Sequence, residues 1–234
     1  GIGWLKFQRM DVQRARDAQQ PGNFLDGPVT RLSAYIRHGV LTLAEVRDAV
    51  FARTCSRQGS EKLMNELGWR DYWQRLWQQL GDGIWRDQEE LKTGHSAAAY
   101  APAIPSDIAE GRTGLACMDG FIADLHHSGW LHNHARMWFA SIWIFTLRLP
   151  WELGAAFFYE HLLDGDVASN TLSWRWVAGL QTPGKTYVAR ADNIAHYTDG
   201  VHAPEAGRLA SAPFAIKEDP LPKVAAWTED AAQV

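Results

Sequence analysis

The stretch from residue 129 to residue 176 constrains this chain most, because it sets very few polar groups in a dense apolar and aromatic background. It reads GWLHNHARMWFASIWIFTLRLPWELGAAFFYEHLLDGDVASNTLSWRW. Charged side chains are rarely buried unless they are paired or bind something. The polar groups that this rule singles out are Asn133, Arg136, Asp164, Asp166 and Asn170.

The spacing of these residues predicts two helix faces. Asn133, Arg136 and Met137 stand at i, i+3 and i+4, so one helix presents all three on one side. Asp166, Asn170 and Trp174 stand at i, i+4 and i+8, so they line a second helix face. Two such faces that meet in an aromatic core would line a slot for a flat ligand.

Helical periodicity dominates the rest of the chain, and the scarcity of strand-like alternation predicts an all-α fold. The 234 residues suit one domain. We expect residues 1–29 to be a leading helix and loop, 30–180 the domain core, and 181–234 an irregular extension. Residues 81–113 are expected to be irregular, and Thr30 or Ser33 to cap a helix. The expected helices span 4–20, 41–54, 60–80, 114–128, 131–148, 151–163 and 166–178.

Composition excludes several classes of protein. The net charge of −4 gives no electrostatic footprint for nucleic acid, although a local basic face is compatible with it. The first 20 residues lack an apolar signal segment, and no apolar run is long enough to cross a bilayer, so we expect a cytoplasmic protein without a membrane partner. Cys55 and Cys117 suit a reducing compartment. Four histidines lie close together in the sequence but lack the spacing of a metal site, so no metal is expected; they are His126, His127, His132 and His134.

Several motifs in order resemble the FAD-binding domain of the photolyase/cryptochrome family. They are GW-x-HN-x-x-RM, LLDGD-x-x-x-N and WRWV, preceded by TRLSAYIRHGVLT (30–42) and NELGWRDYW (65–73). The resemblance covers roughly residues 30 to 180 and implies the family's helical FAD-binding fold. No stretch resembles the family's N-terminal α/β antenna domain, so we expect a flavin domain without it. A separate antenna subunit or protein partner is an open alternative.

The resemblance implies a set of cofactor-binding residues. Arg136 and Asp164 would pair beside the isoalloxazine ring, Asp166 would approach the ring edge and ribose, and Asn170 would face flavin N5. A buried salt bridge with a purely structural role is the alternative for the Arg136–Asp164 pair. Further cofactor contacts implied by the resemblance are Arg70 and Asn133, and the phosphate-binding turn of Thr30, Arg31, Leu32 and Ser33.

The resemblance also implies a substrate site for a pyrimidine dimer. Glu66 would hydrogen-bond the bases, while Trp69 and Trp176 would stack on a dinucleotide that is single-stranded or flipped out of the duplex. Asn133 and Met137 match dimer-contacting positions of the cyclobutane type. Without the resemblance, residues 66–73 would be an ordinary amphipathic helix.

An electron route to the flavin is the third implied feature. Trp174 and Trp151 match the two inner members of the family's tryptophan chain. Ile108 stands where the third member is expected, so Trp130 or Tyr159 would have to serve as another exit, or photoreduction is impaired.

These expectations favour a cyclobutane pyrimidine dimer photolyase-like enzyme, a carbon–carbon lyase with FAD as cofactor and dimer-containing DNA as partner. Its catalytic residues would be Glu66, Asn170, Trp174 and Trp151. A cryptochrome-like blue-light photosensor without repair activity is the first alternative. A flavin-binding remnant or subunit that needs a partner chain is the second.

Overall fold

A computed structural model describes residues 30–53, 57–85, 102–181, 186–205 and 207–210. Every regular element in these residues is helical and none is a strand, which agrees with the expected all-α class. The expected helix over 4–20, the rest of residues 1–29, Cys55 and most of the C-terminal extension lie outside the described residues. No helix within the described ranges has the length and apolar character needed to span a membrane.

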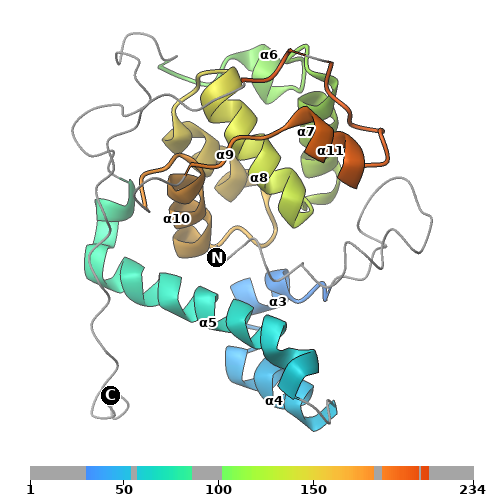
Figure 1. Ribbon diagram of the computed structural model, residues 1–234. Helices are drawn as coiled ribbons and strands as arrows, with labels where there is room; N and C mark the ends of the chain where they lie inside the picture. Colours follow the sequence, from blue (N-terminus) through green and yellow to red (C-terminus); the bar gives the residue numbers. More distant parts are fainter. Residues whose placement is uncertain (1–29, 54–56, 86–101, 182–185, 206, 211–234) are drawn as a thin grey trace.

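The helices form two groups along the chain (Figure 1). The first group and α5 occupy the lower part of the view, and the later helices form a bundle above them. Their bounds are α3 Ser33–Arg37, α4 Leu43–Arg53, α5 Arg57–Leu80, the 3-10 helix η2 Gly81–Trp85, α6 Ser106–Ala109, α7 Ala116–Ser128, α8 Asn133–Ser141, the π-helical turn η4 Ile142–Thr146, α9 Trp151–His161, α10 Val167–Val177 and α11 Ala191–Tyr197.

Local sequence signals account for several helix boundaries. Thr42 and Glu45 form a capping box at the start of α4, since Thr42 N donates to the Glu45 carboxylate and Glu45 N donates to Thr42 Oγ1. Gly129 ends α7 with a φ of 64°, the left-handed conformation that glycine adopts at low cost. Pro150 precedes α9, where a missing N–H removes no helical hydrogen bond.

Two expectations about helices were wrong: the residue that caps α3, and the absence of a helix after Gly179. The N-cap of α3 is Leu32, without a side-chain capping bond, rather than Thr30 or Ser33. The region after Gly179 contains α11, although its turn-rich sequence predicts irregular structure. Tertiary contacts explain this helix, because Ile194 is fully buried and Asn193 accepts a hydrogen bond from the Trp138 indole at 3.1 Å.

The segment expected to be irregular over 81–113 is also partly helical. It contains the short helices η2 and α6. Ile84 explains the first of them, because its side chain is completely buried against α5 and α10. A single buried anchor in a Gly-rich stretch is a weak sequence signal, so periodicity does not detect it.

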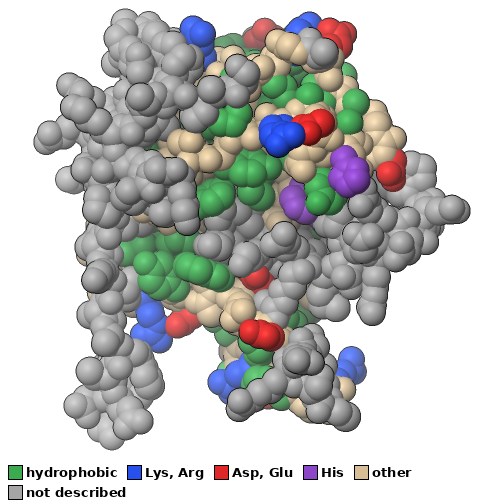
Figure 2. Space-filling view, viewed as in Figure 1, with side chains coloured by type: hydrophobic (Ala, Val, Ile, Leu, Met, Phe, Trp, Pro, Cys, Tyr) green, Lys and Arg blue, Asp and Glu red, His purple; other side chains and the backbone are tan. Residues whose placement is uncertain are grey.

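Helix α10 is the centre of the fold. It packs on α9 and α8 on one side and on α5 and η2 on the other. Trp73, Leu76 and Leu172 fill the α5–α10 interface, and all three are buried. Trp77 and Leu80 are only half-buried, and Figure 2 shows hydrophobic side chains at the surface over this half of α5. The residues of α10 are therefore held by helices from distant parts of the chain.

Candidate functional site

Arg136 of α8 and Asp164 of the loop before α10 form a buried ion pair. Arg136 Nη2 donates to Asp164 Oδ2 at 2.9 Å, and the side chains are 2% and 5% exposed. Arg136 Nε also donates to the carbonyl of Leu131 at 2.9 Å. The sequence prediction that these two residues pair is thus seen in the structure. Removing either partner would leave a buried charge, which costs about 3–5 kcal/mol.

Asp166 has a different environment from the one implied for it, because protein donors surround its carboxylate. It caps α10 by accepting from Ala168 N at 3.2 Å and from Ser169 Oγ at 3.2 Å. Gln74 Nε2 of α5 lies 2.7 Å from both carboxylate oxygens, and Arg70 Nη2 lies 3.5 Å from one of them. Asp166 therefore joins α10 to α5, and its role toward a ribose or ring edge stays a prediction.

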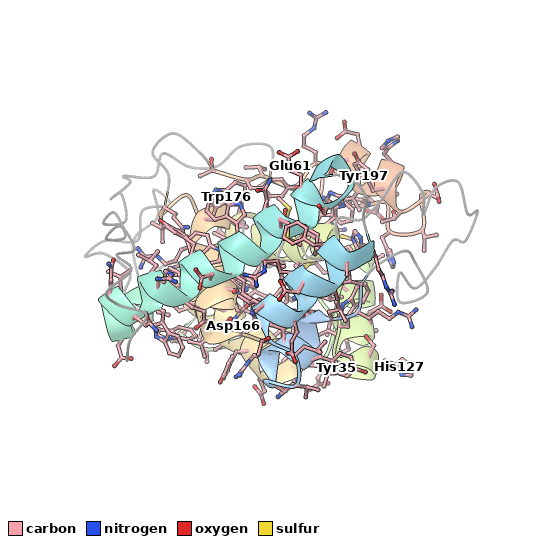
Figure 3. All side chains as sticks on the ribbon, turned by 90° about the horizontal axis from the view of Figure 1, so that it is seen from below. Tyr35, Glu61, His127, Asp166, Trp176 and Tyr197 are labelled. Atoms are coloured by element: carbon pink, nitrogen blue, oxygen red, sulfur yellow. The ribbon has the colours of Figure 1, made fainter. Side chains whose placement is uncertain are left out.

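Gln74 is a member of this cluster that sequence reasoning missed. It lies one helical turn after Arg70 on α5, so both side chains reach the same side of the helix. The i, i+4 spacing from Arg70 is the sequence signal that could have identified Gln74 as a member of this cluster. Figure 3 shows α5 crossing the molecule between the labelled residues Asp166 and Trp176.

Asn170 and Trp174 are buried on α10, as their spacing predicted. The Asn170 amide donates to the carbonyl of Ala155 on α9 at 2.7 Å, which fixes the side-chain orientation. The Trp174 ring meets Phe158 at 5.1 Å and Trp143 at 6.1 Å, both edge to face. Trp143, which lies in the π-helical turn, is thus a direct neighbour of the proposed electron carrier that the sequence did not indicate.

The residues expected to bind the dimer lie on α5, α8 and α10. Glu66 is 1% exposed, whereas Trp69 is half-buried and contacts Tyr72 and Trp73 at ring-centroid distances of 5.5 and 5.7 Å. Trp176 is half-buried and faces Tyr187, with the ring centroids 6.1 Å apart.

Tyr187 and Tyr72 are neighbours of these tryptophans that sequence reasoning did not single out. Burial raises the pKa of Tyr187 to about 12, against a smaller opposing effect of the Trp138 indole. Tyr187 therefore stays a neutral phenol at physiological pH. On α8, Asn133 is buried and Met137 is half-buried.

The turn before α3 has alternating backbone conformations. Arg31 has a φ of 54°, and Leu32 follows with φ −89° and ψ −14°. Alternation between left- and right-handed conformations directs successive N–H groups to one side, an arrangement that favours anions. Thr30 and Ser33 flank these two residues and are half-buried.

The remaining residues of the expected electron route lie in separate environments. Trp151 is buried, and the guanidinium carbon of Arg175 lies 5.9 Å from its ring centroid. Ile108 is half-buried against the core. Trp130 is also half-buried, while Tyr159 is 41% exposed.

Among the described residues, no group of three or more His, Cys, Asp or Glu side chains is placed to hold a metal ion.

Comparison with known protein families shows to which family this chain belongs. The model of the FAD binding domain of DNA photolyase matches residues 63–200, which is more than half of the chain. This chain belongs to the photolyase FAD-binding domain family. The family confirms the expected fold and FAD as the expected cofactor.

Individual photolyase relatives agree with this assignment. A deoxyribodipyrimidine photo-lyase of Streptomyces griseus is 32% identical over 204 residues, which cover 82% of this chain and 42% of the relative. A mitochondrial protein of Neurospora crassa named as a cryptochrome DASH is 29% identical, over 68% of this chain and 27% of its own length. The chain thus spans less than half of the curated relatives that it matches.

A solved photolyase has the same fold. The class III photolyase of Agrobacterium tumefaciens superposes with a TM-score of 0.64 at 24% identity. The match covers 81% of this chain and 39% of that structure.

Buried polar atoms test whether the photolyase cofactor suits these residues. Within the described residues, Asn133 Oδ1 and Asp164 Oδ1 are buried without a hydrogen-bond partner. Each such atom costs about 1–3 kcal/mol when left unsatisfied. Both are acceptors, and a flavin carries a ring N–H and ribityl hydroxyls that donate. The residues around Arg136 therefore fit FAD.

Proposed function

We propose that this protein takes part in light-driven repair of cyclobutane pyrimidine dimers, with FAD held around Arg136, Asp164 and Asn170. The similarity to deoxyribodipyrimidine photo-lyases supports the reaction class. One structural observation carries the proposal. A buried carboxylate, Glu66, lies one helical turn before the half-buried Trp69 on α5, the helix that packs on α10.

The chain's residues have distinct roles in this proposal. Trp69 and Trp176 offer flat apolar surfaces to bases that have left the stack, and aromatic stacking contributes about 1–3 kcal/mol per base. Glu66 accepts hydrogen bonds from the base N–H groups in a site that excludes water, where such bonds are stronger. Asn133 and Met137 contact the dimer from α8.

The cofactor residues keep the ring in place. Arg136 and Asp164 supply fixed opposite charges beside it, and Asn170 presents a neutral amide that does not supply a proton. When bound in its reduced form, FAD would supply on illumination the electron that opens the cyclobutane ring, and would take it back afterwards. Trp174 and Trp151 are proposed to deliver an electron from the surface, and Trp143 extends the aromatic contacts of Trp174.

Repair of defined oligonucleotides tests this function. The FAD-loaded protein is illuminated under reducing conditions with single- and double-stranded DNA that contains one thymine dimer, and dimer loss is measured by chromatography. Glu66→Gln is expected to slow repair about 10–100-fold, because a charged acceptor of two hydrogen bonds becomes a neutral amide with only one acceptor oxygen. Glu61→Gln is the matched control, since Glu61 lies on the same helix and is exposed (Figure 3). Faster repair of the single strand would establish a strand preference.

A cryptochrome-like photosensor is the second candidate function. The similarity to the Neurospora crassa cryptochrome DASH favours it, as does Ile108 at the position expected for the outer tryptophan. A protein that retains FAD but leaves dimers intact in both oligonucleotides would contradict the repair proposal and favour the photosensor.

A further inference from the structure

Arg37 fastens helix α3 to the loop that carries both aspartates of the site. Arg37 Nε donates to the carbonyl of Gly165 at 2.7 Å, and Arg37 Nη2 donates to the Tyr159 hydroxyl at 3.4 Å. The neighbouring His38 Nε2 lies 3.0 Å from the carbonyl of Leu163. These contacts join residues separated by more than 120 positions in the chain.

The loop that Arg37 contacts is closely packed. Gly165 lies between Asp164 and Asp166 and is buried. A Cβ atom at Gly165 would come within 3.0 Å of the Leu162 carbonyl oxygen. The loop is also tied to the end of α7, because Leu163 N donates to the carbonyl of Gly129 at 2.9 Å. The Gly165 carbonyl therefore has little freedom to move. The hydrogen bond from Arg37 holds α3 at a fixed distance from this carbonyl.

Arg37 also lies close to the turn of residues 30–33. It follows Ser33 by one helical turn on α3, a rise of about 6 Å. One short helix thus has the Thr30–Ser33 turn at one end and the Gly165 contact at the other.

We propose that Arg37 is a positioning residue that sets the distance between the turn of residues 30–33 and the loop of residues 163–166. One FAD molecule then engages both, with its diphosphate at the turn and its ring side at the loop. This inference rests on the FAD site of the proposed function. Two contacts on one ligand strengthen each other only when the geometry allows both at once, so fixing the separation raises affinity for FAD. Riboflavin has no diphosphate and gains nothing from the fixed distance.

Apolar contacts also hold helix α3 in place. Ile36 of α3 and Val46 of α4 pack against Leu67 of α5 in a separate apolar cluster. This cluster holds α3 on α5 without the arginine. A substitution at Arg37 is therefore expected to leave the helices formed while it frees the loop contact.

Binding of two flavins to the flavin-free chain tests the proposal. Dissociation constants for FAD and riboflavin are measured by fluorescence titration in the wild type, Arg37→Ala and Arg37→Lys. Arg37→Ala is expected to weaken FAD binding about 10–100-fold while riboflavin binding changes less than about 2-fold. Arg37→Lys restores part of the FAD affinity, because the lysine ammonium still donates but lacks the planar fork that reaches both the Gly165 carbonyl and the Tyr159 hydroxyl. Arg47→Ala, which removes an exposed arginine paired with Asp48, is the control and changes neither constant.

Other outcomes would overturn the proposal. Equal losses of FAD and riboflavin affinity in Arg37→Ala would assign the residue a purely structural role, and unchanged FAD affinity would assign it none. If Arg37→Ala does not fold by circular dichroism, the comparison uses Arg37→Lys and His38→Ala, which each remove part of the contact. A wild type that binds neither flavin would overturn the FAD site itself, and with it this inference.

Discussion

Arg136 and Asp164 are joined by a 2.9 Å hydrogen bond in a region that water hardly reaches. The second carboxylate oxygen, Asp164 Oδ1, has no hydrogen-bond partner among the described residues. The pair therefore stabilises the contact between α8 and the loop before α10, and it still has one acceptor for a ligand.

Asp164→Asn is expected to destabilise the flavin-free chain by about 3–5 kcal/mol, because the buried Arg136 charge loses its counter-charge. Urea unfolding followed by circular dichroism measures the change. Asp192→Asn is the control, because Asp192 pairs with Arg190 at the surface and such pairs contribute about 0–1 kcal/mol. Equal losses of stability in the two variants would contradict the larger cost expected for breaking the buried pair.

Gly154→Ala is expected to destabilise the chain by about 1–3 kcal/mol or more through overpacking. The added Cβ would lie 2.3 Å from the Trp174 ring and 3.0 Å from Trp143 Nε1, and neither ring has room to move in the core. Thermal unfolding measures the loss. In a double-mutant cycle, Trp174→Leu is expected to cost less stability in the Gly154→Ala background than in the wild type, because the smaller side chain removes the clash.

Gly68→Ala is the control, because it is expected to raise the stability of the chain where Gly154→Ala lowers it. Gly68 is also helical, but a Cβ there meets nothing within 4 Å. Since alanine favours a helix over glycine by about 1 kcal/mol, this substitution is expected to stabilise. Destabilisation by Gly68→Ala similar to that by Gly154→Ala would contradict the steric explanation.

Acid is expected to destabilise the protein through His132, which caps α8 by accepting from His134 N. Burial lowers the pKa of His132 from 6.5 to about 3, with smaller effects of His134 and Arg136 in the same direction. Above pH 6.5 the ring is neutral whether the chain is folded or unfolded. Between pH 6.5 and 3 only the unfolded chain takes up the proton, so stability falls as pH falls, by up to about 1.4 kcal/mol per pH unit.

His132→Asn tests this assignment, because asparagine also caps helices and does not titrate. Urea unfolding between pH 7 and pH 5 is expected to show a weaker pH dependence in the variant. An unchanged dependence would assign the acid sensitivity to other groups, such as His161 or His202, whose pKa values are also lowered by burial.

Most of the fold was predictable from local patterns. The apolar spacing from residue 114 onward predicted α7 to α10, and the boundary at Pro150 follows from proline chemistry alone. The family resemblance predicted the pairing of Arg136 and Asp164, and the pairing also has a physical reason, because a charge in so apolar a stretch needs a partner. Helix α11 was missed because Ile194 and Asn193 are stabilised by residues far away in the chain.

The all-α class, the burial of the polar residues on α8 and α10, and the family to which the chain belongs all follow from the amino-acid pattern alone. The hydrogen-bond donors and aromatic neighbours of each of these residues depend instead on how the helices pack. Gln74 reaches Asp166 and Tyr187 faces Trp176 because α5 and the segment after α10 lie against α10, and Arg37 reaches Gly165 because α3 packs on α4 and α5. Helical periodicity fixes the direction of a side chain on its own helix, but the partner comes from another helix whose placement depends on the packing of the whole core.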